Sequence, residues 1–260
     1  MLIMEPADFY TGLVADLYAV LRSVDPDPEP YARFITRWGE PALELGCGDG
    51  DPMLNLRQRG LHVEGLDSSS DMLDRCRARA ASDALEVVLH HSTIESMNLG
   101  KRFRSIYLAG PTFNLIADDG TAQCALERIR FHLEPGGAAV IPLFIPPPIK
   151  ESQIQRATEH RTAEGVLLRC TTMSVHRDEA ARRQAVVLRY ERIDGAATEV
   201  VDREWSVHWH TPSGFRRLAI DAGLHVRSVR DASGGPASDD ATQFAVVVTR
   251  SASATGHDPD

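Results

Sequence analysis

The spacing of apolar residues predicts two helices at the start of the chain. Apolar side chains recur every four residues from Phe9 to Leu21, which predicts a helix over residues 5–22. The alternating prolines of Asp25–Pro30 end this helix, because proline lacks the amide hydrogen that a helix needs and restricts the residue before it. A short second helix is predicted over Tyr31–Trp38.

From residue 42 onward, short apolar runs alternate with helical segments. Strands are predicted at Ala42–Leu45, Leu61–Leu66, Leu85–Leu89, Ser105–Ala109 and Ala138–Ile145. Alternation of strand and helix with short connections predicts an α/β fold with a doubly wound, mostly parallel sheet. Pro142 lies inside the fifth strand, where it removes a ladder hydrogen bond, so we expect a bulge or an early strand end there.

The pattern changes after the three prolines at 146–148, where strands follow one another without helices. These strands are predicted at Val166–Val175, Gln184–Ile193 and Glu199–His210, with a tight turn at Asp194-Gly195. The first pattern then returns with a helix at residues 213–222 and strands at 224–230 and 243–249. A loop joins these last two strands, so we expect them to pair antiparallel or to lie apart.

These changes divide the chain into five segments. They are an N-terminal helical lid (1–38), a core (39–149), an antiparallel β insertion or cap (150–210), the last helix and strands of the core (211–250) and a disordered tail (251–260).

Composition narrows the possible functions. The 260 residues carry a formal net charge of −9 without a run of Lys and Arg, which argues against a nucleic-acid partner. We find neither an apolar run long enough for a membrane span nor a signal peptide, so we expect a cytoplasmic protein without a membrane partner. The four cysteines form no Cys-x-x-Cys pair, so neither a disulfide framework nor a metal is expected.

The candidate ligand site lies at the end of the first predicted strand. Gly46, Gly48 and Gly50 form a turn between this strand and a helix N-terminus, where open α/β sheets bind ligands. Asp67 ends the second strand, and its carboxylate can accept hydrogen bonds from both ribose hydroxyls. Together they indicate an adenosine-containing ligand. The glycine spacing differs from the GxGxxG of dinucleotide-binding proteins.

The segment Glu44–Gly50 resembles the first motif of class I S-adenosylmethionine (SAM)-dependent methyltransferases. Leu66–Leu73 resembles the second motif of this family, and Leu133–Gly137 resembles the turn before its fifth strand. The resemblance implies a Rossmann-like core with an antiparallel last strand, with SAM as cofactor and S-adenosylhomocysteine (SAH) as product. The third strand departs from the family pattern, because His90-His91 stand where an acidic residue is often found.

The resemblance also implies roles for individual residues. Glu44 is expected to hold the amino end of the cofactor, Asp67 its ribose, and Met72 its adenine together with the backbone of Thr93 and Ile94. The full set of implied cofactor residues is Tyr18, Glu44, Gly46, Cys47, Gly48, Gly50, Asp67, Ser68, Met72, Thr93, Ile94, Ala109 and Gly110.

Methyl transfer from a sulfonium is a displacement, so alignment of the reacting atoms supplies much of the acceleration. A general base is needed only where the nucleophile arrives protonated. His208 and His210 share one face of their strand and are candidates for this role, although hydrogen-bonded structural histidines are an open alternative. Asn114 follows the fourth strand and is a candidate substrate contact or a helix cap.

The favoured function is therefore methyl transfer from SAM to an N or O atom of a small-molecule acceptor. Two alternatives stay open at this point: an NAD(P)-dependent oxidoreductase with a non-standard glycine loop, and a non-catalytic SAM-binding partner protein. The acceptor and the oligomeric state are not readable from the sequence.

Overall fold

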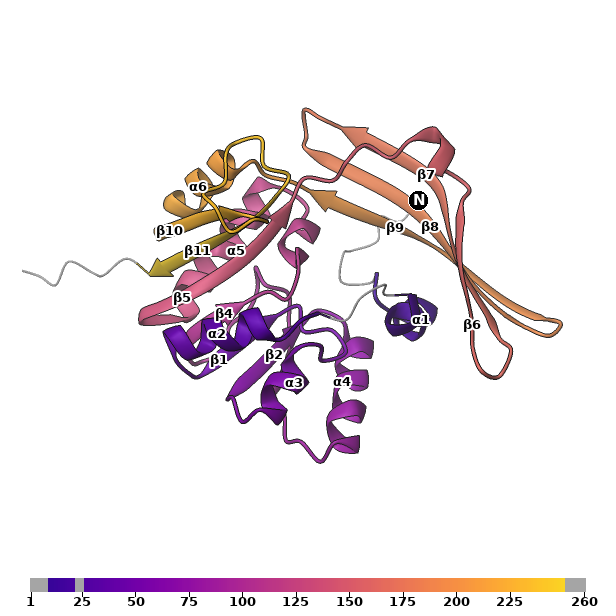
Figure 1. Cartoon of the computed structure of the whole chain (residues 1–260), viewed down its shortest axis with the longest axis horizontal. Helices are drawn as coiled ribbons and strands as arrows, with labels where there is room; N and C mark the ends of the chain where they lie inside the picture. Colours follow the sequence, from indigo (N-terminus) through magenta and orange to yellow (C-terminus); the bar gives the residue numbers. More distant parts are fainter. Residues whose placement is uncertain (1–8, 22–25, 251–260) are drawn as a thin grey trace, which may run out of the picture.

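The computed structural model describes residues 9–21 and 26–250, except the side chains of residues 18–21. Its largest element is a seven-stranded sheet (Figure 1). The strands lie in the order β10 (Leu224–Asp231), β11 (Gln243–Arg250), β5 (Leu133–Phe144), β4 (Phe103–Tyr107), β1 (Ala42–Leu45), β2 (Val63–Asp67) and β3 (Leu89–His91). The five strands from β5 to β3 are parallel, and β11 is antiparallel to both of its neighbours. The mostly parallel sheet and the antiparallel last strand are confirmed.

Helices cover both faces of this sheet. One face packs against α2 (Glu29–Trp38), α3 (Met53–Gln58) and α4 (Ser70–Ser82). The other packs against α5 (Asp119–His132) and α6 (Pro212–Asp221). Side chains of β1 point alternately to the two faces of the sheet. Ala42 packs in the core beside α2, α3 and α4, whereas Leu43 and Leu45 pack in the core beside α5 and α6. Burial on both faces explains why three of the four residues of this strand are apolar, and it also buries the fourth, Glu44.

The strands differ from expectation in several details. β5 begins at Leu133 rather than at Ala138, so the predicted turn at Leu133–Gly137 lies inside this strand. β3 begins at Leu89, and the apolar Leu85 and Val87 pack beside α3 and α4 without belonging to the strand. β5 continues through Pro142, which pairs in register with Ala245, so the expected bulge is wrong. β4 pairs with β5 only as far as Val140, so the proline breaks no ladder hydrogen bond to β4.

A separate antiparallel sheet, which we call the cap, follows the core. Its strands lie in the order β6 (Ala157–Arg161), β7 (Leu167–Asp178), β8 (Arg183–Asp194) and β9 (Ala197–His208). The predicted turn joins β8 to β9, where Gly195 has a φ of +57° that favours glycine. Strand β6 was not predicted, because all five of its residues are exposed and show no apolar alternation.

Helix α1 (Leu13–Leu21) lies between the core and the cap (Figure 1). The Gly12 amide donates to the Asp71 carboxylate of α4 at 2.8 Å, and the Ser69 hydroxyl donates to the Tyr10 carbonyl at 2.6 Å. The apolar face of α1 packs against Leu168 and Tyr190 of the cap. The predicted helix therefore starts at Leu13 within the described residues, whereas residues 5–8 lie outside them.

Among the described residues, no helix is both long and apolar enough to cross a membrane. The predicted tail at 251–260 lies outside the described residues. The division into lid, core and cap stays a prediction, although the antiparallel sheet does fall within residues 150–210.

Candidate cofactor site

A cavity of about 580 Å³ opens at the carboxyl ends of β1, β2 and β4. This is the edge at which open α/β sheets bind their ligands. Seventeen residues line it: Tyr10, Gly46, Gly48, Leu66, Asp67, Ser68, Met72, Ser92, Thr93, Ile94, Glu95, Thr112, Leu115, Ile116, Ala117, Asp118 and Thr121.

The glycine turn forms one wall of the cavity. Gly46 and Gly48 line it with φ values of +71° and +53°, a region that residues with a Cβ rarely adopt. A Cβ on Gly46 would lie 2.6 Å from Cγ2 of Thr112. Gly50 has a different task, because a Cβ there would meet Leu54 and Cys76 inside the core. Gly46 and Gly48 therefore leave space at the cavity wall, whereas Gly50 allows Leu54 and Cys76 to pack against the turn.

Asp67 presents its carboxylate to the same cavity. One carboxylate oxygen accepts the Gly48 amide and the other accepts the Ser69 amide, each at 2.8 Å. Burial raises the pKa of Asp67, and these amide hydrogen bonds lower it in part. An ionised carboxylate has about four acceptor positions, so Asp67 can accept ligand hydroxyls in addition to these amides.

Glu44 is buried below the turn and does not line the cavity. Its Oε2 accepts the Tyr107 hydroxyl at 2.7 Å, while its buried Oε1 has no hydrogen-bond partner in the described residues. Burial is the main cause that raises the pKa of Glu44 to about 8. An unpaired buried carboxyl oxygen is costly, and a cationic ligand group near it would satisfy it.

The remaining predicted residues fall into two groups. Ser68, Met72, Thr93 and Ile94 line the cavity, whereas Cys47, Ala109 and Gly110 do not. The Tyr18 side chain lies outside the described residues.

Sequence reasoning missed much of the wall after β4. Leu115–Asp118 and Thr121 come from the loop and the first turn of α5. The sequence did carry one signal for this wall, because the loop leaves the carboxyl end of a strand that lies next to β1.

Comparison with known proteins agrees with this geometry. Residues 42–137 match the family model of a methyltransferase domain. A dTDP-3-amino-3,6-dideoxy-alpha-D-glucopyranose N,N-dimethyltransferase of Streptomyces fradiae is 26% identical over 242 residues, which cover 89% of this chain and 90% of the relative. Residues 42–137 are therefore a class I SAM-dependent methyltransferase domain. The oxidoreductase and the non-catalytic alternatives give way to this assignment.

Solved structures share the fold of this methyltransferase along nearly its whole length. The CcbJ methyltransferase of Streptomyces caelestis has a TM-score of 0.72 at 21% identity, with 96% of this chain and 99% of that chain covered. The sugar N-methyltransferase KedS8 of Streptoalloteichus sp. has a TM-score of 0.69 at 18% identity, with 91% and 93% covered. The likeness therefore includes the cap as well as the core.

The residues of the methyltransferase fit SAM. The turn at Gly46 and Gly48 leaves room that a Cβ would reduce, and Asp67 lines the cavity with a carboxylate that can accept ribose hydroxyls. Glu44 does not line the cavity, so its expected contact with the amino end of the cofactor stays a prediction.

Asn114 is placed as a structural residue by its contacts. Its amide nitrogen donates to the carbonyls of Phe144 at 3.0 Å and His208 at 2.9 Å, and its oxygen accepts the Phe144 amide at 3.1 Å. Both of its donor hydrogens are thereby used, and the residue does not line the cavity. Its catalytic role stays a prediction that these contacts do not favour.

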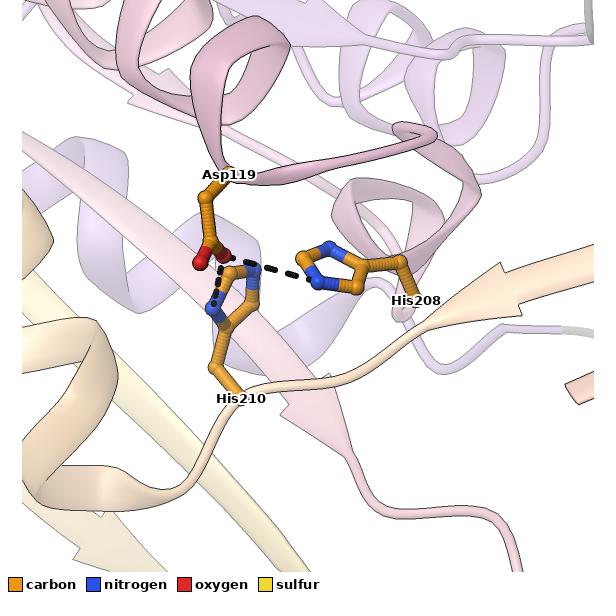
Figure 2. A group of neighbouring side chains, drawn as sticks. All are labelled: Asp119, His208 and His210. Carbon is orange, nitrogen blue, oxygen red and sulfur yellow. Dashed lines mark ion pairs between the residues drawn. The ribbon is translucent and has the colours of Figure 1, made fainter. Parts of the chain in front are cut away.

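His208 and His210 meet Asp119 at the first turn of α5 (Figure 2). The same carboxylate oxygen lies 3.5 Å from Nε2 of His208 and 3.6 Å from Nδ1 of His210. Burial lowers the pKa of both histidines, that of His210 to about 3. Neither ring lines the cavity, and a base so weak is poorly matched to proton transfer near neutrality. Their catalytic role stays a prediction.

Proposed function

We propose that the acceptor is an amino group on a sugar joined to a nucleoside diphosphate, and that the enzyme methylates this nitrogen. The main support is the Streptomyces fradiae relative, which is named for a dTDP-linked amino sugar and aligns along 89% of this chain. A nucleic-acid acceptor is disfavoured by the net charge of −9, because such proteins usually need a basic surface.

The charge of the cavity also favours an amine. Asp118 and Glu95 both line it. The Thr121 backbone N–H is the main cause that lowers the pKa of Asp118, so this carboxylate stays ionised near neutrality. A carboxylate attracts an ammonium group and accepts a hydrogen bond from an amine, so it suits the nitrogen end of the acceptor.

For methyl transfer, the protein mainly has to align the acceptor nitrogen with the methyl group and the sulfur. SAM supplies a methyl group on a sulfonium, which is an activated leaving group. Asp67, Met72 and the glycine turn would hold it in the cavity, and Asp118 would turn the acceptor amine toward it. The amine must be neutral when its nitrogen attacks the methyl group and SAH leaves. The methylated ammonium that forms can then lose a proton to water or to a nearby carboxylate. Tyr10, which precedes α1, also lines the cavity, and the Ser69 hydroxyl donates to its carbonyl.

A panel of three acceptors tests the proposal. The purified enzyme and SAM are incubated with the dTDP-linked 3-amino-3,6-dideoxy sugar, with its 3-hydroxyl analogue, and with the free amino sugar. Mass spectrometry then counts the transferred methyl groups. We expect one or two methyl groups on the nucleotide-linked amine and none on the hydroxyl analogue. Methylation of the hydroxyl analogue, or equal rates with the free sugar, would contradict the proposal.

A further inference from the structure

The structure brings together three metal-binding side chains that are far apart in the sequence. Asp119 begins α5, whereas His208 ends β9 and His210 follows it (Figure 2). Their ligand atoms all lie within 4.8 Å of one another. We propose that Asp119, His208 and His210 bind a divalent transition-metal ion, with Zn²⁺ as the representative ion, at the junction of the core and the cap. This site is separate from the proposed methyl-transfer function.

The distances within the group suit an ion better than hydrogen bonds. The Asp119 oxygen lies 3.5 Å and 3.6 Å from the two ring nitrogens, beyond the usual hydrogen-bond range of about 2.7–3.2 Å. Metal–ligand bonds of about 2.0–2.2 Å in a tetrahedral site place neighbouring ligand atoms roughly 3.4 Å apart. The three side chains therefore face one another across the space that one ion would need.

The surroundings of the ligands support the same interpretation. His208 and His210 are only 4% and 2% exposed, and burial favours the neutral imidazole that binds metals. Nε2 of His208 faces Asp119, whereas its Nδ1 has no hydrogen-bond partner in the described part of the chain, so Nε2 is the ring nitrogen placed to bind the ion.

The carboxylate is oriented from its other side. Arg182 forms an ion pair with Oδ2 of Asp119, which leaves Oδ1 turned toward the two histidines. Ligating carboxylates commonly have such a second partner. The Asp119 side chain is 52% exposed, so an ion can enter from solvent and water can complete its coordination.

The ligand set selects the type of metal. Two imidazoles and one carboxylate suit Zn²⁺, Co²⁺, Ni²⁺ or Fe²⁺, whereas Mg²⁺ and Ca²⁺ prefer oxygen ligands. The ion would join the end of β9 to the first turn of α5, directly after Asp118 of the cofactor cavity. Its expected effect is to fix the cap relative to the core. A ligating histidine cannot also accept a proton, so this role excludes the predicted catalytic role of the two rings.

Metal titration of the untagged, chelator-treated, full-length enzyme tests the site. Calorimetry with Zn²⁺ measures affinity and stoichiometry, and the visible absorption of added Co²⁺ reports its ligand geometry. Asp119→Asn is the main variant, because the side chain is half exposed and its loss leaves the buried rings in place. Asp221→Asn, at an exposed end of α6, is the matched control.

We expect one Zn²⁺ per wild-type chain and a Co²⁺ spectrum typical of four or five nitrogen and oxygen ligands. Asp119→Asn should lose at least tenfold in affinity and should lose that spectrum, while Asp221→Asn should match wild type. SAH binding by each variant is measured beside it, so that failure of this site is distinguishable from failure of the cofactor site. The absence of stoichiometric binding by the wild type, or equal metal affinity in Asp119→Asn, would overturn the proposal. If wild type binds no metal and metal-free Asp119→Asn loses turnover, the proposal is likewise overturned. That result would favour a catalytic role for Asp119 with one of the two histidines.

Discussion

At the residue scale, Asp67 performs two tasks at one strand end. It accepts the amides of Gly48 and Ser69, which holds the glycine turn against the start of α4. Its remaining acceptor positions face the cavity, where the ribose of the cofactor is expected.

Replacing Asp67 by Ala should therefore weaken SAH binding without unfolding the chain. Charge-assisted hydrogen bonds contribute about 1.5–3 kcal/mol each. One such bond corresponds to about tenfold to a hundredfold in affinity, so we expect a loss of at least about tenfold, measured by calorimetry. Asp74→Ala, exposed on α4, is the control and should bind SAH like wild type. An unchanged affinity in Asp67→Ala would contradict the placement of the ribose.

Glu44 makes the stability of the free protein depend on pH. Its pKa is raised from 4.5 to about 8, mainly by burial, so the folded state keeps this proton over a pH range in which the unfolded state has lost it. Stability should therefore fall as pH rises between about 4.5 and 8.

The variant Glu44→Gln tests this dependence. The neutral amide still accepts from Tyr107 and does not titrate, so its melting temperature should fall less than that of wild type between pH 5.5 and 8, as measured by calorimetry. For a chain of this length, each kcal/mol of stability corresponds to about 2–4 °C. Glu127→Gln, exposed on α5, should keep the wild-type slope. Parallel curves for wild type and Glu44→Gln would show that Glu44 is ionised throughout.

At the scale of elements, the glycine turn joins β1 to α3 and shapes the cavity. Gly46→Ala adds a methyl group 2.6 Å from Thr112 at a φ of +71°, whereas Gly60→Ala adds one at a φ of +85° in open space. In both variants, alanine in the left-handed backbone region should lower the free energy of unfolding by about 1–2 kcal/mol. Only Gly46→Ala should also reduce SAH affinity, by at least tenfold in calorimetry. Equal SAH affinities in both variants would contradict the close approach at Gly46.

Asn114 links three elements: the short 3₁₀ helix Thr112–Leu115, the end of β5 and the end of β9. Asn114→Ala leaves three backbone groups without this partner, one buried and two partly buried, at about 1–3 kcal/mol for each group that stays unpaired. We expect a loss of roughly 2–4 kcal/mol in the free energy of unfolding. Denaturant unfolding measures it, with the exposed Asn55→Ala as control. A loss below about 1 kcal/mol would mean that water replaces these bonds.

At the scale of the whole molecule, the sequence predicts what local patterns encode. The strand and turn at Ala42–Gly50 and the aspartate at 67 lie where their motifs indicated, because glycine conformation and strand ends are local properties. The parallel direction of the core strands followed from their alternation with helices, whereas the order of the strands was not predicted.

Long-range contacts explain what the sequence did not predict. The exposed β6 has no apolar alternation and is recognisable only through its pairing with β7. Likewise, the meeting of Asp119 with His208 and His210 depends on how the cap docks on α5, which residue spacing does not show. The wall formed by Leu115–Asp118 depends on the neighbouring position of β4 and β1.

The cavity at the ends of β1, β2 and β4 is expected to hold the cofactor. A crystal structure of the enzyme with SAH would decide this. We expect both ribose hydroxyls within hydrogen-bond distance of Asp67, with the adenine beside Met72 and Ile94. SAH bound in another cavity, or with its ribose away from Asp67, would show that the cofactor site lies elsewhere.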